Sequence, residues 1–506
     1  MYIYINIYSL ILISFFNSFI YCSPVLNEIS STPLLLLISF DGFRWDYPDL
    51  YKLSNFSLLM KRGVRVKYIE NNFATVTFPV HYTIVTGLYE EAHGIVANTI
   101  YDPKFNAVAT FDTMNDTKWW SQNPYSQPIW VSNQLANDSN QRRSGVIAWP
   151  GSDTPINGHR PFKYQSFDLN RKFDSILKQI FDWFHEPIET RINFGVIYYP
   201  EPDITGHHHG PISNEMNKTL QECDNYIGQL LAIIDSDEYL KTNLNVIITS
   251  DHGMEEIKKD HTIILEDYID TSLCSAYGSR AFVNIFVYSE LNIDRIYANL
   301  STIQNYEVYK KSQIPEEYHY KSNIRIGDIL FIGKPGYEII VPGDNPSIEL
   351  LGDHGYGNRV KSMYPIFYGF GPVFQQNMQA EPFHTVDIYP LMSYILKLET
   401  RITNGSLDNA KHILRDHLKG KFLNEINLFV LTTTTNITSW GYTTVLCLIL
   451  VILIGIIYTI AACRHSQQLI YVESQYVPVR YRLLSNNEGS KSNLFADESG
   501  NEEETQ

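Results

Sequence analysis

LLLLISFDG, residues 34–42, is an unbroken apolar run that ends in an acidic residue and a glycine. A short continuous apolar run that stops at a turn signal is typical of a strand buried on both faces of a sheet. Helical patterns, such as residues 170–184 and 214–234, lie between this run and others of the same kind. The alternation predicts an α/β fold with a mainly parallel sheet covered by helices on both faces. The other runs are GVIAWP (145–150), FGVIYYP (194–200), NVIITSDHG (245–253) and YPIFYGFG (364–371).

Outside these runs the chain divides into further segments. From residue 254 to about 350 the alternation is irregular, and we interpret this span as a cap inserted into a catalytic domain of residues 24–400. Residues 401–440 are interpreted as a stalk that ends in a Thr/Asn-rich stretch. Residues 1–23 are mostly apolar and end in small residues, which predicts a secretory signal peptide, although no Lys or Arg begins it.

A second apolar segment, YTTVLCLILVILIGIIYTIAA (442–462), contains no charge and is long enough to cross a bilayer of about 30 Å. Arg464, Arg480 and Arg482 follow it, whereas no basic cluster precedes it. Basic residues favour the cytoplasmic side of a membrane. The pattern predicts a single-pass type I protein of the plasma membrane, with an extracellular catalytic domain and a cytoplasmic tail of residues 463–506.

The composition of the 506 residues fits this location. The formal net charge of −16 argues against nucleic-acid binding, because phosphate backbones attract basic surfaces. Two cysteines, Cys223 and Cys274, fall in the predicted catalytic domain, and the sequence leaves open whether they form a disulfide. Seven N-x-S/T sequons precede the membrane segment and predict a glycosylated ectodomain: Asn55, Asn115, Asn137, Asn217, Asn299, Asn404 and Asn436.

Acid and imidazole side chains gather where predicted strands end. Asp203 and His207 stand four residues apart in EPDITGHHHGP (201–211), while SDHG (250–253) and GDHGYGN (352–358) each place an Asp before a His. In α/β sheets, ligands bind beyond the carboxyl ends of the strands. Carboxylate oxygens and neutral imidazoles bind zinc, and two metal ions about 4 Å apart stabilise both the attacking and the leaving oxygen of a phosphoryl group. Each motif alone also fits a turn or an exposed loop, but their joint occurrence favours a metal site.

Taken in order, these motifs resemble the ectonucleotide pyrophosphatase/phosphodiesterase family of the alkaline phosphatase superfamily. The resemblance covers residues 34–398 and implies an alkaline-phosphatase-like fold. We find neither cysteine-rich somatomedin-like modules nor a nuclease-like domain, so the chain resembles the short members, types 4 to 7. Its predicted type I anchor is most similar to types 4 and 5. The matching motifs are FDGFRWDY, NNFATVTFPVHYTIVTGLYEEAHGIVANTIYDP, AWPGSD, YYPEPDITGHHHGP, TSDHGM and GDHGYGN.

The resemblance implies a nucleotide pyrophosphatase/phosphodiesterase with two Zn²⁺ ions per chain. Such an enzyme would cleave phosphodiester or pyrophosphate bonds of extracellular nucleotides or dinucleotides through a phosphothreonine intermediate. Thr77 would be the nucleophile and Asn98 would contact a phosphate oxygen, while Phe78 and Tyr164 would sandwich a nucleobase. One zinc ion would be bound by Asp41, Asp251 and His252, with Thr77 nearby, and the other by Asp203, His207 and His354.

The local pattern around Thr77 has an ordinary interpretation as well. In ATVTFPVHYTIVTG (74–87), threonine is a favoured helix N-cap, Pro79 falls in the first turn and Gly87 closes the segment. The two interpretations are compatible, because the N-terminus of a helix also attracts phosphate.

Two other functions remain open. A phospholipase C-like choline-phosphodiester hydrolase would use the same metal chemistry, with Phe78 and Tyr164 lining a lipid pocket or filling a core. A catalytically silent adhesion ectodomain would be expected to have lost at least one of the six metal ligands or Thr77, and all seven are present.

Overall fold

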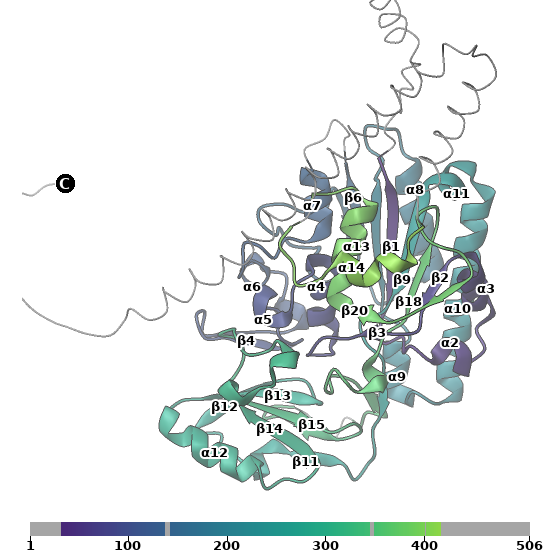
Figure 1. Cartoon of the computed structure of the whole chain (residues 1–506). Coiled ribbons are helices and arrows are strands. Elements are labelled where there is room, and N and C mark those ends of the chain that lie inside the picture. Colours follow the sequence, from purple (N-terminus) through teal and green to yellow (C-terminus); the bar gives the residue numbers. More distant parts are fainter. Residues whose placement is uncertain (1–31, 137–141, 345–348, 400, 416–506) are drawn as a thin grey trace, which may run out of the picture. The chain divides into compact units, whose positions relative to one another are not determined.

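The structure, a computed structural model, describes residues 32–136, 142–344, 349–399 and 401–415. Its centre is an eight-stranded sheet in the order β19-β2-β18-β9-β1-β8-β6-β7 (Figure 1). The strands from β9 to β7 are parallel, and β18 runs antiparallel to both β9 and β2. The predicted α/β fold is confirmed, and each of the five apolar runs supplies a strand. The strands are β1 (Leu34–Phe40), β2 (Val64–Val66), β6 (Ser144–Ile147), β7 (Lys163–Gln165), β8 (Phe194–Tyr199), β9 (Leu244–Thr249), β18 (Phe367–Phe370) and β19 (Met378–Ala380).

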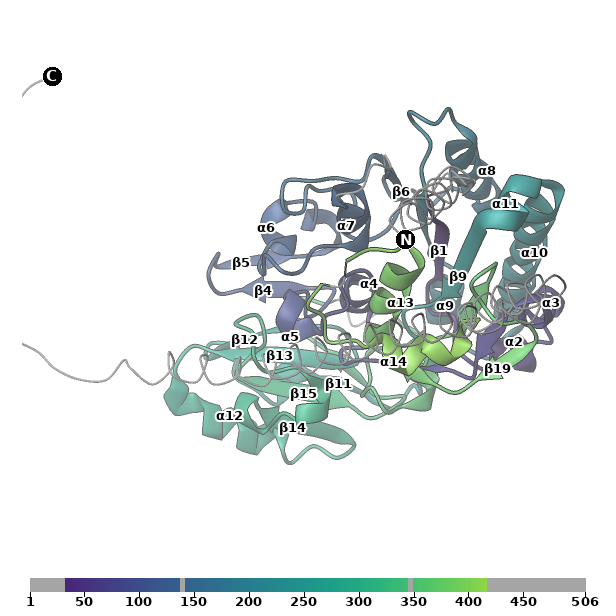
Figure 2. The same ribbon diagram turned by 45° about the horizontal axis from the view of Figure 1, so that its top comes forward.

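Strand β1 shows why both faces of the sheet are covered. All seven of its residues are buried, and successive side chains enter two different apolar cores. Leu35 and Leu37 pack with residues of α4, α7 and α13, whereas Leu36 and Ile38 pack with residues of α3, α8 and α10. Figures 1 and 2 show these two groups of helices on opposite sides of the sheet. Burying each leucine stabilises the fold by about 1.5–3 kcal/mol, so exposing either face of this strand would be costly. The helices are α3 (Ser54–Arg62), α4 (Thr77–Thr86), α7 (Ile129–Leu135), α8 (Phe173–His185), α10 (Asn214–Ser236) and α13 (Ile388–Ile395).

Residues 254–350, which we continue to call the cap, contain a second sheet with its own apolar core. Its four antiparallel strands have the order β12-β13-β15-β14, and the helix α12 packs against them (Figure 1). A parallel pair, β11 and β16, lies in the same span, and the antiparallel pair β10 and β17 connects its two ends. The elements of the cap are β10 (Glu255–Glu256), β11 (Thr262–Ile264), β12 (Cys274–Gly278), β13 (Phe282–Val287), α12 (Ile293–Leu300), β14 (Tyr306–Lys310), β15 (Ile329–Gly333) and β16 (Glu338–Ile340); β17 (Gly352–Asp353) follows directly after it.

The described structure corrects one boundary and answers one open question. Residues 401–415, predicted as the start of a stalk, pack into the catalytic unit: Ala410 and Ile413 are fully buried in the core that contains α4. The apolar residues of this stretch are few, and their burial depends on partners far away in the sequence. Cys223 and Cys274 are both buried, and they are not bonded to each other.

Several predictions concern residues outside the described part of the chain. These are the signal peptide (1–23), the membrane span (442–462), the cytoplasmic tail (463–506) and the sequons at Asn137 and Asn436. They stay predictions. Among the residues that the structure does describe, none of the helices is long and apolar enough to cross a membrane.

Candidate active site

The carboxyl ends of three neighbouring strands place aspartates at one edge of the sheet. Asp41 directly follows β1, Asp251 lies two residues beyond β9, and Asp203 begins the helix α9 (Asp203–His209) that follows β8. The close approach of these segments requires Gly42, whose φ is +67° and where a Cβ would lie 2.9 Å from the Cα of Asp203. The Gly42 N–H also donates to Oδ1 of Asp251 at 3.0 Å.

The first predicted ligand group assembles at this edge. Nε2 of His252 lies 3.0 Å from Oδ2 of Asp251 and 3.4 Å from Oδ1 of Asp41. All three side chains are buried. Burial, together with the nearby carboxylates of Asp251 and Asp203, raises the pKa of Asp41 well above its usual range. Carboxylates this close repel one another, so the arrangement needs positive charge among them.

The second predicted group adjoins the first. Nε2 of His207 lies 3.3 Å from Oδ2 of Asp203, and Nε2 of His354 lies 3.5 Å from Oδ1 of the same carboxylate. The ligand atoms of these three residues all lie within 4.8 Å of one another. The rings of His354 and His252 stack with centroids 3.5 Å apart, so the two groups share one cluster.

The hydrogen bonding around the cluster fits metal ions. Oδ1 of Asp41, Oδ1 of Asp203 and Oδ2 of Asp251 are buried and have no hydrogen-bond partner among the described residues. Each imidazole has Nδ1 against a backbone carbonyl, which leaves Nε2 facing the carboxylates, as in protein metal sites. Carboxylate and imidazole together form the ligand set that zinc accepts. The Nδ1 contacts are His207 with the carbonyl of Gly352 (2.9 Å), His252 with that of Gly253 (2.9 Å) and His354 with that of Thr75 (3.1 Å).

Thr77 lies beside this cluster at the N-terminus of α4. It is the first helical residue, while Val76, which has extended φ and ψ, is the N-cap; the predicted N-cap role of Thr77 is therefore wrong by one position. The predicted C-terminus is confirmed, because Gly87 is the C-cap with φ of +68°. Oγ1 of Thr77 lies 3.5 Å from Nε2 of His252. Its hydroxyl is thus at the edge of the carboxylate–imidazole cluster.

Asn98 and His81 fix the surroundings of Thr77. The N–H of Phe78 donates to Oδ1 of Asn98 at 2.9 Å, which leaves Nδ2 of Asn98 to donate elsewhere. Nδ1 of His81 lies 2.8 Å from the Thr77 carbonyl, and its Nε2 lies 2.9 Å from the hydroxyl of Ser39. Sequence reasoning missed His81, although its position four residues after Thr77, one helical turn, was a usable signal.

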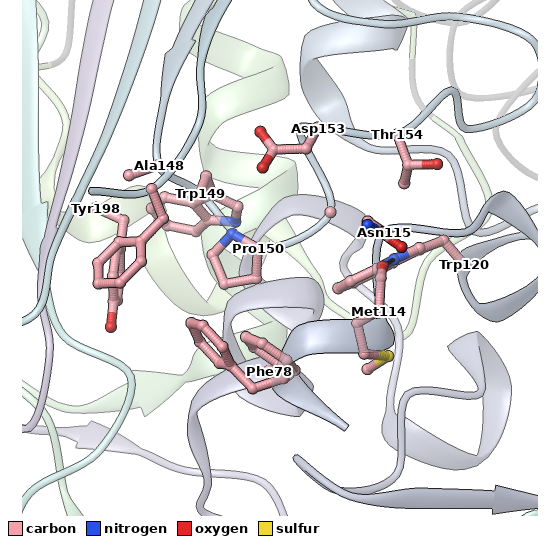
Figure 3. Close-up of a pocket in the computed structure, with 13 residues that line it drawn as sticks. Phe78, Met114, Asn115, Trp120, Ala148, Trp149, Pro150, Asp153, Thr154 and Tyr198 are labelled. Atoms are coloured by element: carbon pink, nitrogen blue, oxygen red, sulfur yellow. Dashed lines mark hydrogen bonds between the residues drawn. The ribbon is translucent and has the colours of Figure 1, made fainter. Parts of the chain in front are cut away.

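An aromatic pocket with a cavity of about 120 Å³ opens beside the cluster (Figure 3). Tyr198 connects the two, since its hydroxyl donates to Oδ2 of Asp41 at 2.6 Å while its ring lines the pocket. Phe78 and Phe111 stack with centroids 5.5 Å apart and planes inclined by 17°. The other rings that line the pocket belong to Trp120, Trp149 and Phe167.

The structure does not bring Tyr164 into this pocket. Its side chain is 42% exposed on the edge strand β7, where its hydroxyl accepts a hydrogen bond from Arg160. Phe167, three residues later, lines the pocket instead and packs edge-on against Phe111. Tyr164 is therefore not placed with Phe78 as predicted, and Phe167 is the aromatic residue of this stretch that lines the pocket.

The predicted glycosylation sites differ in accessibility. Asn115, Asn217, Asn299 and Asn404 are exposed, and Asn115 also borders the aromatic pocket. Asn55 is only partly exposed, and the Nδ2 atom to which a glycan would be attached donates to Asp224 at 3.0 Å.

Two adjoining carboxylate–imidazole groups at the carboxyl edge of a parallel sheet, beside a helix N-terminus, fit a metal-dependent hydrolase that acts on a phosphoryl group. Comparison with known proteins agrees: residues 35–357 match the family model of type I phosphodiesterase / nucleotide pyrophosphatase. The chain belongs to this family. It is a nucleotide pyrophosphatase/phosphodiesterase, a hydrolase of phosphodiester or diphosphate bonds.

Several proteins of the family, and solved structures of one of them, are similar to this chain. The chain is 37% identical over 412 residues to human ectonucleotide pyrophosphatase/phosphodiesterase family member 5, with 80% of this chain and 83% of the relative covered. It is 39% identical over 393 residues to the bis(5'-adenosyl)-triphosphatase of Xenopus laevis, covering 76% and 82%. A structure of mouse family member 5 matches with a TM-score of 0.71 and 36% identity, over 76% of this chain and all of that chain. A similar match is an inactive threonine-to-alanine variant of the mouse protein in complex with AMP.

Proposed function

We propose that this chain hydrolyses nucleotide phosphodiester or pyrophosphate bonds through a covalent phosphothreonine on Thr77, with two zinc ions bound by the two ligand groups. The observation that carries the proposal is the Thr77 hydroxyl, 3.5 Å from Nε2 of His252. It lies at the positive end of the α4 dipole, where phosphate binds favourably. The unpartnered carboxylate oxygens and inward Nε2 atoms support a bound metal pair.

The residues of the chain have separate tasks in this mechanism. Thr77 Oγ1 forms a bond to phosphorus as the bond to the leaving oxygen breaks, and water then hydrolyses the phosphothreonine. Nδ2 of Asn98 donates to an oxygen of the phosphoryl group, while its Oδ1 stays bonded to the Phe78 N–H. His81 orients the first turn of α4 through the Thr77 carbonyl. Bound zinc would supply Lewis-acid chemistry, favouring the alkoxide of a nearby hydroxyl and neutralising phosphoryl charge.

We propose nucleotides and dinucleotides as the substrates, with the base bound in the aromatic pocket that Phe78, Phe111 and Phe167 line. The AMP complex of the mouse relative and the name of the frog relative, a bis(5'-adenosyl)-triphosphatase, support this choice. A choline-phosphodiester hydrolase is the competing hypothesis, because aromatic rings with a nearby carboxylate, here Asp153, can also enclose a quaternary ammonium group. Hydrolysis of lysophosphatidylcholine at a higher kcat/KM than of nucleotides would favour it.

We further propose that the enzyme acts outside the cell. The predicted signal peptide (1–23), the apolar segment 442–462 and the sequons support a type I plasma-membrane glycoprotein with the tail 463–506 in the cytoplasm. Proteolysis of intact expressing cells that left the catalytic domain untouched would contradict this topology.

The test of the reaction compares Thr77→Ala with Thr86→Ala in the full chain. Thr86 is a buried threonine at the other end of α4, and its hydroxyl donates to the Tyr82 carbonyl. With a nitrophenyl ester of thymidine monophosphate, we expect Thr77→Ala to lose turnover while retaining zinc, and Thr86→Ala to remain active. Near-normal turnover in Thr77→Ala, or activity that survives complete chelation, would refute the proposal.

A further inference from the structure

One loop of the cap contacts several parts of the candidate site. It connects β14 to β15 and comprises residues 311–328. Its partners are the segment 94–98, which ends in Asn98, the residue Asp102 at the end of β4 (Ile100–Asp102), and residues 118–119, which precede Trp120 in the pocket wall. The loop therefore contacts both the segment that carries Asn98 and the segment that carries Trp120 of the pocket wall.

Tyr320 is the contact nearest to Asn98. Its side chain is fully buried, and its hydroxyl donates to the carbonyl of Val96, two residues before Asn98, at 2.8 Å. The same hydroxyl accepts a hydrogen bond from Nδ2 of Asn284, on β13, at 2.8 Å. The carbonyl of Val96 is thus bonded through Tyr320 to the sheet of the cap.

Arg325 holds the same segment from its other side. Its guanidinium is fully buried and donates to the carboxylate of Asp102 at 2.7 Å and to the carbonyls of Gly94 at 2.6 Å and Trp119 at 2.9 Å. A buried charge needs a partner, and here arginine and aspartate satisfy each other. Arg325 therefore connects the start of the Asn98 segment to the wall of the base pocket.

The aromatic packing of the loop extends to the segment before Thr77. The ring of Tyr318 stacks on Phe73 with centroids 4.7 Å apart, and Tyr320 contacts the same ring edge-on at 4.9 Å. Phe73 lies four residues before Thr77. Both Thr77 and Asn98 therefore lie in segments that pack against this loop.

We propose that the loop of residues 311–328 is a positioning element for the reaction, in which Tyr320 and Arg325 fix the segment 94–102 so that Nδ2 of Asn98 meets the transferred phosphoryl group. The inference rests on the proposed role of Asn98. If the cap only stabilised the fold, it would not need to contact the chain both before and after Asn98. Tyr320 and Arg325 touch no reacting atom, so they act through Asn98.

The test is a double-mutant cycle between Tyr320→Phe and Asn98→Ala in the full chain. Tyr320→Phe removes one hydroxyl and keeps the ring against Phe73. We expect it to lower kcat about tenfold with KM nearly unchanged, because the base pocket keeps its rings. In the Asn98→Ala background the same change should lower kcat by less than about twofold, since the group it positions is already absent.

Tyr306→Phe is the matched control. Its hydroxyl donates to the carbonyls of Glu338 at 2.9 Å and His261 at 3.2 Å, both inside the cap, so the variant also loses a tyrosine hydrogen bond to backbone. We expect a similar change in melting temperature to that of Tyr320→Phe, with normal kcat. Equal losses of kcat from Tyr320→Phe in both Asn98 backgrounds would overturn the inference and leave only a structural role.

The inference and the proposed reaction can fail separately. Wild-type turnover in Asn98→Ala would overturn the inference, because the reaction would then not depend on the position of the Asn98 amide. The proposed nucleophile is tested separately, by the turnover of Thr77→Ala. If Tyr320→Phe does not fold, a second variant, Asn284→Ala, tests the same inference. It removes the donor to the Tyr320 hydroxyl and the acceptor of the Gly327 N–H in the same loop, and we expect a fall in kcat that is again absent in the Asn98→Ala background.

Discussion

Replacing Phe167 by alanine should impair the hydrolysis of nucleotides much more than that of substrates without a base. The ring lines the aromatic pocket together with Phe78 and packs against Phe111 and Tyr198, with centroids 5.8 and 5.9 Å away. Stacking of a base on an aromatic side chain contributes about 1–3 kcal/mol. Because Phe78 and Phe111 would remain, we expect the lower part of this range, about 1–2 kcal/mol, or about a 5- to 30-fold loss of kcat/KM.

The assay compares two substrates and two variants. The nitrophenyl ester of thymidine monophosphate carries a base, and bis(nitrophenyl) phosphate does not. For Phe167→Ala the loss should occur with the first substrate and be less than about twofold with the second. Tyr164→Ala is the matched control: the same type of truncation three residues away, at a side chain that does not line the pocket. Equal losses with both substrates, or a larger loss from Tyr164→Ala, would refute our assignment of the base pocket.

Three further predictions concern metal, glycosylation and pH. Chelation should lower the melting temperature as well as the activity, and Zn²⁺ should restore both. The reason is that a metal at about 1,000 times its Kd stabilises the fold by about 4 kcal/mol. An unchanged melting temperature would contradict the proposed metal site. Peptide mapping should find glycan at the exposed Asn217 but not at Asn55, whose Nδ2 is bonded to Asp224. Burial, together with the nearby Arg325, lowers the pKa of His93 to about 3, so between about pH 6.5 and 3 the unfolded chain binds one more proton than the fold. The contribution of His93 to the free energy of unfolding should then fall by about 1.4 kcal/mol per pH unit of acidification. Thermal melts of His93→Gln should show a flatter pH dependence, and parallel curves would contradict this.

The clustering of the candidate metal ligands could be predicted from the sequence because most of them follow strands that are recognisable from composition alone. Asp41 and Asp251 follow the apolar runs that form β1 and β9, and parallel strands direct their carboxyl ends to one edge. His354 could not be predicted in this way, because it follows the cap and not a strand of the main sheet. Among the features of the sequence, only the repeated Asp-His-Gly motif indicated it. The resemblance to a family then gave the grouping of the ligands, which neither spacing nor composition provides.

The aromatic partner of Phe78 shows where such reasoning stops. Tyr164 and Phe167 lie three residues apart in one polar stretch, and both have the chemistry to stack on a base. Strand β7 ends at Gln165, so the regular alternation of side chains stops between them. Which ring enters the pocket depends on how the chain turns after the strand, and this turn is determined by packing against Phe111 and Tyr198, not by local pattern.

The cap contacts were the least predictable, because they join residues more than two hundred positions apart. Arg325 and Asp102 are each fully buried, and neither could stay charged without the other. The carbonyls of Val96 and Gly94 likewise receive their hydrogen bonds from Tyr320 and Arg325. Truncating Arg325 alone would leave the buried Asp102 carboxylate without its charged partner, at a substantial cost in free energy. The irregular span 254–350 therefore belongs to the same compact unit as the catalytic sheet, and the segment that carries Asn98 is bonded directly to it.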